Sequence, residues 1–168
     1  MLKKQYKMSN GVKSKERTLV IIKPDALQRN LLGEIIGRFE RKGLKIAGLK
    51  MIQLEDVLLD EHYGHHKDKA FFGGLKKFMK SAPVIVVVLE GLEAVKTLRF
   101  ICGPTCGRAA DAGTIRGDFS MSGQLNIIHA SDSVKSAEKE IYRFFNNDEL
   151  FDYPKIDFDF LYSDDEKE

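Results

Sequence analysis

His129 lies between a short apolar run and the start of a helical pattern, in the stretch NIIHASDS at residues 126–133. A neutral imidazole is both a nucleophile and a proton acceptor near neutral pH. A histidine in this place is therefore either buried and hydrogen-bonded for structural reasons or kept reactive for group transfer. Both interpretations stay open until the rest of the chain has been considered.

A reactive imidazole needs an acceptor that fixes the orientation and tautomer of its ring. Glu140 follows His129 by 11 residues, close to the apolar stripe of the next helix, and Ser131 is near enough to bridge the two. Each also has an ordinary interpretation, because Glu140 could be an exposed acid like Glu138, and Ser131 could belong to the helix cap. The spacing makes Glu140 the candidate orienting acid.

Four cationic side chains are expected near this histidine: Lys23, Arg99, Arg108 and Arg116. Lys23 ends the first strand before the turn at KPD, and Arg116 lies in GTIRGDF, just ahead of the histidine strand. Converging cations are typical of sites for anionic, phosphate-bearing ligands. The alternative is that each is a solvated surface charge, which is the usual state of lysine and arginine.

The elements that must position these residues alternate between strands and helices. Apolar runs bounded by turn residues predict strands, and apolar residues at three- and four-residue spacing predict helices. The expected strands are 18–22, 44–54, 82–91 and 125–130, and the expected helices are 31–43, 55–66, 70–80, 92–101 and 132–145. Residues 102–123 are rich in glycine and lack periodicity, so they are predicted to form a long functional loop.

This order of elements predicts an α+β fold of the ferredoxin-like, split βαβ kind. Such a fold has a four-stranded antiparallel sheet, with helices packed on one face. Enzymes, RNA binders and regulatory domains all use it, so the fold alone does not decide the function.

The length of 168 residues predicts one domain, with a charged segment at each end. Residues 1–16 are basic and nearly free of apolar side chains, which predicts a disordered extension. Residues 17–156 form the expected domain, and residues 157–168 an acidic, solvated tail.

The bulk properties exclude several classes of protein. A formal net charge of +2 does not indicate dedicated nucleic-acid binding, and the longest apolar run, Val84 to Leu89, is too short to span a membrane. The chain opens without a signal-peptide pattern, so a cytoplasmic location is expected. Cys102 and Cys106 are expected to be reduced thiols.

Four stretches resemble nucleoside diphosphate kinases. They are ERTLVIIKPDALQRNLLGEIIGRFERKG, EHYGHHKDKAFF, GTIRGDF and above all NIIHASDSVKSAEKEI. The resemblance covers residues 16–153, and the stretches follow one another in the order that the family has.

The resemblance implies a ping-pong transfer of the γ-phosphate of a nucleoside triphosphate, mainly ATP, to nucleoside diphosphates. His129 would be phosphorylated on Nδ1, with Glu140 and Ser131 orienting its ring from the other side. Mg²⁺ would be held mainly by the nucleotide phosphates and water. The implied nucleotide contacts are Lys23, Arg99 and Arg116 to phosphates, Tyr63 and Thr105 through hydroxyls, Asn126 and Lys23 to the sugar, and Phe71 stacked on the base.

The resemblance also implies a homo-oligomer, either a hexamer or a tetramer. No P-loop motif is present, so side-chain cations replace its backbone cradle. Stacking on one ring tolerates every base, so broad nucleotide specificity is expected. The run TCGRAADAG after Pro104 and the residues before Asn126 depart from the family pattern, which affects the expected loop and the edge of the sugar site.

Three alternatives remain. An RNA-binding module is possible for this fold, although no strand carries the aromatic RNP pattern. His62, His65 and His66 could form a metal site, with His62 and His66 one helical turn apart. A catalytically inactive scaffold of the same family is the more serious rival, although such proteins lose the histidine or its cations, and all are present here.

Overall fold

The structure is a computed structural model that describes residues 15–167. The expected N-terminal extension, residues 1–16, lies outside the described residues except for its last two. Those two, Lys15 and Glu16, begin the first strand, which is therefore longer than the predicted 18–22.

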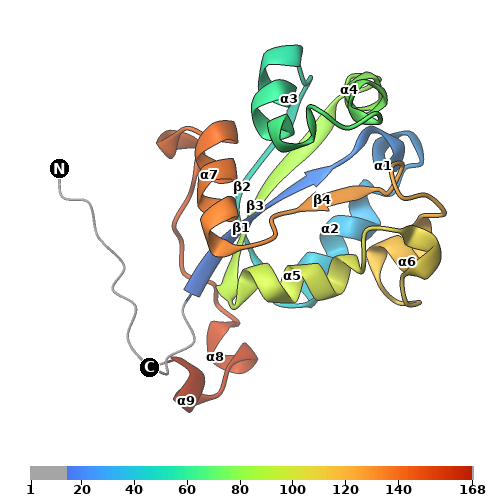
Figure 1. Ribbon diagram of the computed structural model, residues 1–168. Coiled ribbons are helices and arrows are strands. Elements are labelled where there is room, and N and C mark those ends of the chain that lie inside the picture. Colours follow the sequence, from blue (N-terminus) through green and yellow to red (C-terminus); the bar gives the residue numbers. More distant parts are fainter. Residues whose placement is uncertain (1–14, 168) are drawn as a thin grey trace.

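Four strands form one antiparallel sheet in the order β2-β3-β1-β4 (Figure 1). Their bounds are β1 Lys15–Ile22, β2 Lys45–Ile52, β3 Val84–Leu92 and β4 Ile128–Ala130. The chain thus has the predicted ferredoxin-like α+β fold. The glycine that weakens the pattern of β2, Gly48, lies at a bulge, where a Cβ atom would come 2.9 Å from a methyl group of Leu150. Only glycine lets the chain after the last long helix cross β2 so closely.

Helices cover both faces of the sheet, so the prediction of a single covered face is wrong (Figure 1). One core contains residues of α1 Pro24–Gln28, α2 Leu32–Arg41, α5 Ala94–Cys102 and α6 Ile115–Phe119. The other contains residues of α3 Asp56–His62, α4 Phe72–Met79 and α7 Val134–Phe144. The reason is that β1 and β3 are apolar at successive positions, so neither face of the central strands can be left to water.

Two short helices lie where the sequence predicts turns and loop. Helix α1 begins at Pro24, whose fixed φ suits a first helical position. Residues 102–123 were expected to be a loop without regular structure. This prediction is wrong, because they contain the 3₁₀ turn η2 Gly107–Ala109 and helix α6. The Thr114 side chain caps α6 by accepting from the Gly117 amide. A helix of five residues is too short to show a period.

The C-terminal segment begins with the 3₁₀ turn η3 Asn147–Glu149. The expected tail at 157–168 contains two short helices, α8 Phe158–Leu161 and α9 Asp164–Lys167, although most of its described residues are exposed. The Tyr162 hydroxyl accepts a hydrogen bond from the amide of Leu92, at 3.3 Å, and Leu161 lies over Gly43. This segment therefore packs on the end of the sheet that carries the start of β1 (Figure 1).

The remaining 3₁₀ turn, η1 Gly64–His66, follows α3. Between residues 15 and 167, every helix is too short or too polar to cross a membrane.

Candidate active site

His129 is the middle residue of β4, where it pairs with Ile21 of β1. The strand begins straight after a γ-turn in which the Ile128 amide donates to the Asn126 carbonyl at 2.7 Å and Ile127 has φ of 71°. A β-branched residue at positive φ is strained. The Ile127 amide donates to the Asp25 carboxylate at 3.0 Å, and its carbonyl accepts from the Lys23 amide at 2.9 Å. These two bonds hold the turn, and with it the residues on either side.

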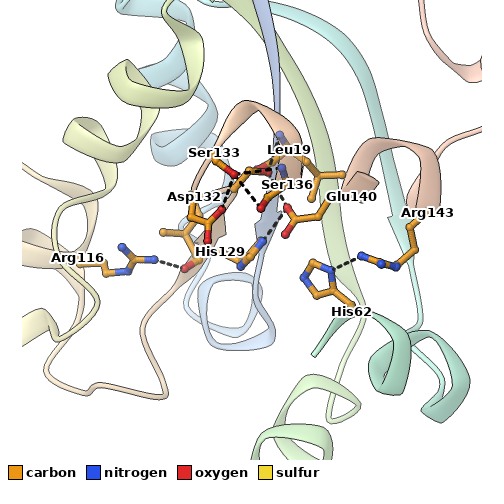
Figure 2. A network of polar contacts seen from close by, with 11 residues as sticks. Leu19, His62, Arg116, His129, Asp132, Ser133, Ser136, Glu140 and Arg143 are labelled. Atoms are coloured by element: carbon orange, nitrogen blue, oxygen red, sulfur yellow. Dashed lines mark hydrogen bonds and ion pairs between the residues drawn. The ribbon is translucent and has the colours of Figure 1, made fainter. Parts of the chain in front are cut away.

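Glu140 reaches the histidine from α7, whose first turn is capped by Ser133 (Figure 2). The His129 Nε2 atom lies 3.1 Å from Glu140 Oε2, and the Ser131 hydroxyl lies 2.6 Å from the same oxygen. An ionised carboxylate only accepts hydrogen bonds, so Nε2 carries the proton and Nδ1 keeps its lone pair. This arrangement leaves Nδ1 as the ring nitrogen that is free to act as a nucleophile.

The charge of Glu140 is maintained by the same contacts. Burial alone would raise its pKa, but the hydrogen bonds from His129 and Ser131 outweigh burial, and the pKa lies below its ordinary value. The carboxylate is therefore ionised whenever the site works near neutral pH.

Lys23 and Asn126 form a second polar group, in which Lys23 Nζ donates to Asn126 Oδ1 at 2.5 Å. The amide nitrogen of Asn126 donates to the carbonyl oxygens of Thr105 and Gly123, both at 2.9 Å. Burial, and then the neighbouring charge of Arg116, lower the pKa of Lys23 to about 8. The lysine is thus held at the end of β1 with its charge only partly compensated.

Arg116 is buried and donates to three backbone carbonyls, those of Gly103, Asn126 and Ile128. Burial lowers its pKa from the ordinary value, although a guanidinium stays charged at any physiological pH. A guanidinium has five N–H groups, so two remain for a ligand. Arg116 therefore ties together the loop after α5 and the turn before β4.

The other expected residues are less closely connected. Arg99 is exposed near the end of α5 and lines a cavity of about 410 Å³ together with Asp132 and Ser133. Phe71 is 39% exposed, and its ring lies edge-on to His66 at 5.3 Å. Thr105 is exposed, as is Arg108, which donates to the Met121 carbonyl at 2.8 Å. Arg108 does not join the histidine group within the described chain.

Three residues near the centre were not predicted to belong to the histidine group: Arg143, Asp25 and His62, which the sequence offered only as part of a metal site. The His62 ring lies 4.7 Å from that of His129, between centroids, and the expected Tyr63 ring lies 6.1 Å away. Burial, and then the nearby His129, lower the pKa of His62 to about 2, and burial raises that of Tyr63. Sequence spacing gave no signal for these contacts.

Among residues 15–167, one group of side chains has its potential ligand atoms close together: those of His62, His129 and Glu140 lie within 4.8 Å of one another. It differs from the trio considered from the sequence, because His65 and His66 are not part of it and instead contact each other, with tilted rings whose centroids lie 3.9 Å apart. Two nitrogen donors and one oxygen do not suit Mg²⁺, which prefers oxygen ligands in octahedral geometry. This trio therefore does not suit Mg²⁺ as a set of protein ligands.

Comparison with known proteins identifies the family. A model of the nucleoside diphosphate kinase family matches residues 16–150. The nucleoside diphosphate kinase of Parabacteroides distasonis is 54% identical over 151 residues, covering 90% of this chain and 99% of that protein. Nucleoside diphosphate kinase B of Bos taurus is 51% identical over 147 residues, with 88% and 97% covered.

Solved structures agree with the sequence comparison. The Halobacterium salinarum nucleoside diphosphate kinase in complex with CDP superposes with a TM-score of 0.87 at 42% identity, covering 89% of this chain and all of that one. A transition-state mimic of the Borrelia burgdorferi enzyme, with bound vanadate and ADP, gives a TM-score of 0.80 at 37% identity, with 85% and 94% covered. The family model, the relatives matched over nearly their full length and the matching structures all agree with the positioned histidine in a ferredoxin-like sheet. The chain therefore belongs to the nucleoside diphosphate kinase family.

Proposed function

We propose that this nucleoside diphosphate kinase transfers the γ-phosphate of a nucleoside triphosphate, mainly ATP, to nucleoside diphosphates through a phosphohistidine on His129. The observation that carries the proposal is the hydrogen bond from His129 Nε2 to Glu140, which leaves Nδ1 with its lone pair. The ring is thereby held with Nδ1 unprotonated, which is the state that attack on a phosphorus atom requires.

The reaction then has two balanced steps. Nδ1 attacks the γ-phosphorus, the bond from that phosphorus to the oxygen bridging to the β-phosphate breaks, and the nucleoside diphosphate leaves. In the second step, a terminal phosphate oxygen of the acceptor diphosphate attacks the same phosphorus, the bond from phosphorus to Nδ1 breaks, and Nδ1 regains its lone pair. While the ring carries the phosphoryl group it retains its Nε2 proton, and the Glu140 carboxylate stabilises the resulting positive charge. Ser131 holds that carboxylate in place.

Nucleotide binding is assigned to the residues around this centre. Lys23, Arg99 and Arg116 neutralise the phosphates, and Tyr63 and Thr105 add hydroxyl contacts. Asn126, which already accepts from Lys23, binds the sugar hydroxyl, and Phe71 stacks on the base with its exposed face. Mg²⁺ neutralises phosphate charge and is held by the nucleotide and water, with no protein ligand.

The working form is proposed to be a cytoplasmic homo-oligomer, a hexamer or alternatively a tetramer, whose catalytic domain is residues 17–156. Two exposed apolar side chains on the edge strand β2 support subunit contacts: Leu49 is 49% exposed and Met51 is 59% exposed. Free thiols at Cys102 and Cys106 suit a reducing compartment.

The direct test uses ATP labelled in its γ-phosphate. With Mg²⁺, the protein should become labelled on a bond that is labile in acid and stable in base, and ADP or GDP should discharge the label. His129→Ala should abolish labelling while nucleotide still binds. A label that survives this substitution would show that the nucleophile is another residue.

A further inference from the structure

Two buried polar atoms beside the nucleophile lack a hydrogen-bond partner within residues 15–167. They are His62 Nε2 and the Tyr63 hydroxyl, on side chains that are 5% and 6% exposed. Buried polar groups are nearly always paired, because leaving one unpaired is costly. Two such groups near one reactive ring point to a ligand that pairs them.

The other nitrogen of His62 faces Arg143 of α7 (Figure 2). Arg143 NH1 lies 3.4 Å from His62 Nδ1, and Arg143 Nε donates to Glu61 at 2.9 Å. A guanidinium can only donate, so Nδ1 accepts, and the single proton of the neutral ring must sit on Nε2. The His62 ring thus has Arg143 on one side and His129 on the other (Figure 2).

We propose that Arg143 is a positioning residue that holds His62 in the tautomer with its proton on Nε2, so that a neutral N–H donor stands ready for the phosphoryl group carried by His129. This inference rests on the proposed function, since the phosphohistidine supplies the acceptor oxygens. The Tyr63 hydroxyl is the second donor of the same pair.

Selection of the tautomer matters because His62 cannot become doubly protonated in this place. Its burial, before any neighbouring charge, keeps the ring neutral through the physiological range. With the proton on Nδ1, Nε2 would offer the group carried by His129 a lone pair in place of a proton, and Nδ1 would turn a proton toward Arg143. Both contacts would then be repulsive, whereas the observed tautomer makes both favourable. A donor fixed before the reaction needs no reorganisation during it.

The test compares Arg143→Met, which keeps an apolar stem but removes the donor, with Lys139→Met. Lys139 is exposed on the same helix and is the matched control. Glu61→Gln is a second variant, because it loosens the anchor of Arg143 without touching the core; Glu61 is 60% exposed in its side chain. The tautomer is read from the imidazole nitrogen resonances of ¹⁵N-histidine-labelled protein.

In wild type and Lys139→Met, the His62 proton should be on Nε2. In Arg143→Met it should move at least partly to Nδ1, and single-turnover phosphorylation of His129 by ATP and Mg²⁺ should slow about fivefold, the effect of losing about one net hydrogen bond. The Kd for ADP should stay within about twofold, since the donor acts on the transferred group. Glu61→Gln should shift both readouts less, in the same direction.

An unchanged tautomer in Arg143→Met, or an unchanged rate despite a changed tautomer, would overturn the inference. A rate and an ADP affinity that fall together, with the tautomer retained, would indicate ordinary structural damage and would also overturn it. Failure of the proposed function is separate, because it would appear as a label that persists in His129→Ala.

Discussion

At the scale of single residues, Lys23 links the chemistry of the site to pH. Its pKa of about 8 means that the side chain is charged below that pH and neutral above it. We expect kcat/KM for nucleotide to fall about tenfold between pH 7 and pH 9, because the neutral amine no longer binds phosphate. Lys23→Met should have low activity and no such step. A flat profile for wild type across this range would mean that Lys23 does not contact the phosphates.

The same group acts on stability in the opposite direction. The folded-state pKa is lowered from 10.5 to about 8, so between these values the unfolded chain binds more protons than the folded chain. The contribution of Lys23 to the free energy of unfolding should therefore increase as pH rises through this window, which makes the folded protein more stable. Loss of activity above pH 8 is thus not explained by unfolding through this residue, and a denaturation series at pH 7 and pH 9 separates the two effects.

The sequence suffices for contacts that are local along the chain and fails for those that join distant elements. His129, Ser131 and Glu140 lie within 11 residues of one another, so a strand followed by a capped helix brings them together. The contact of Arg143 with His62 spans 81 positions, and that of Asp25 with Ile127 spans 102. Such pairs depend on how α3, α7 and α1 pack on the sheet, which periodicity does not specify.

At the scale of elements, α6 needs a glycine at one position of the motif GTIRGDF, because its backbone there lies against the chain before the helix. A Cβ atom at Gly117 would overlap the carbonyl oxygen of Asp111, and Gly117 follows the phosphate-site candidate Arg116. Gly117→Ala should therefore lower the free energy of unfolding by about 1–3 kcal/mol, as overpacking does, and weaken ADP binding. Denaturant unfolding at fixed protein concentration and a titration with ADP measure the two effects.

Gly123→Ala is the matched control, because a Cβ atom there has no neighbour within 4 Å. Its stability should stay within about 0.5 kcal/mol of wild type. Equal losses for both variants would show that backbone entropy, and not the contact with Asp111, is responsible.

The sequence of β3 does contain a signal that both faces of the sheet are covered by helices. The run VIVVVLEG of β3 is apolar at every early position, which is typical of a strand buried on both faces. Each of the five expected helices is present, but their distribution between the two faces of the sheet depends on connection geometry. Short elements such as α6 and α8 leave no period to detect.

At the scale of the whole molecule, the exposed apolar side chains of β2 predict assembly. Light scattering should give a multiple of 19.0 kDa for wild type, and the double variant Leu49→Glu, Met51→Glu should lower the mass, because charges on an edge strand oppose pairing. Val57→Glu, which changes an exposed residue on α3, should leave the mass unchanged. A wild-type mass near 19.0 kDa would contradict the proposed oligomer.

The hydrogen bonds between Ser131, directly after β4, and Leu19 of β1 have a consequence for the exchange of amide hydrogens with solvent. The Ser131 amide donates to the Leu19 carbonyl at 3.1 Å, and the Ser131 hydroxyl, which also holds Glu140, accepts from the Leu19 amide at 3.3 Å. A three-residue edge strand would otherwise fray easily. Because one serine bonds to both the strand and the acid, an opening that exposes the Ser131 amide to deuterium also breaks a contact that supports Glu140. The exchange rate of the Ser131 amide therefore reports how often Glu140 loses the support of this serine.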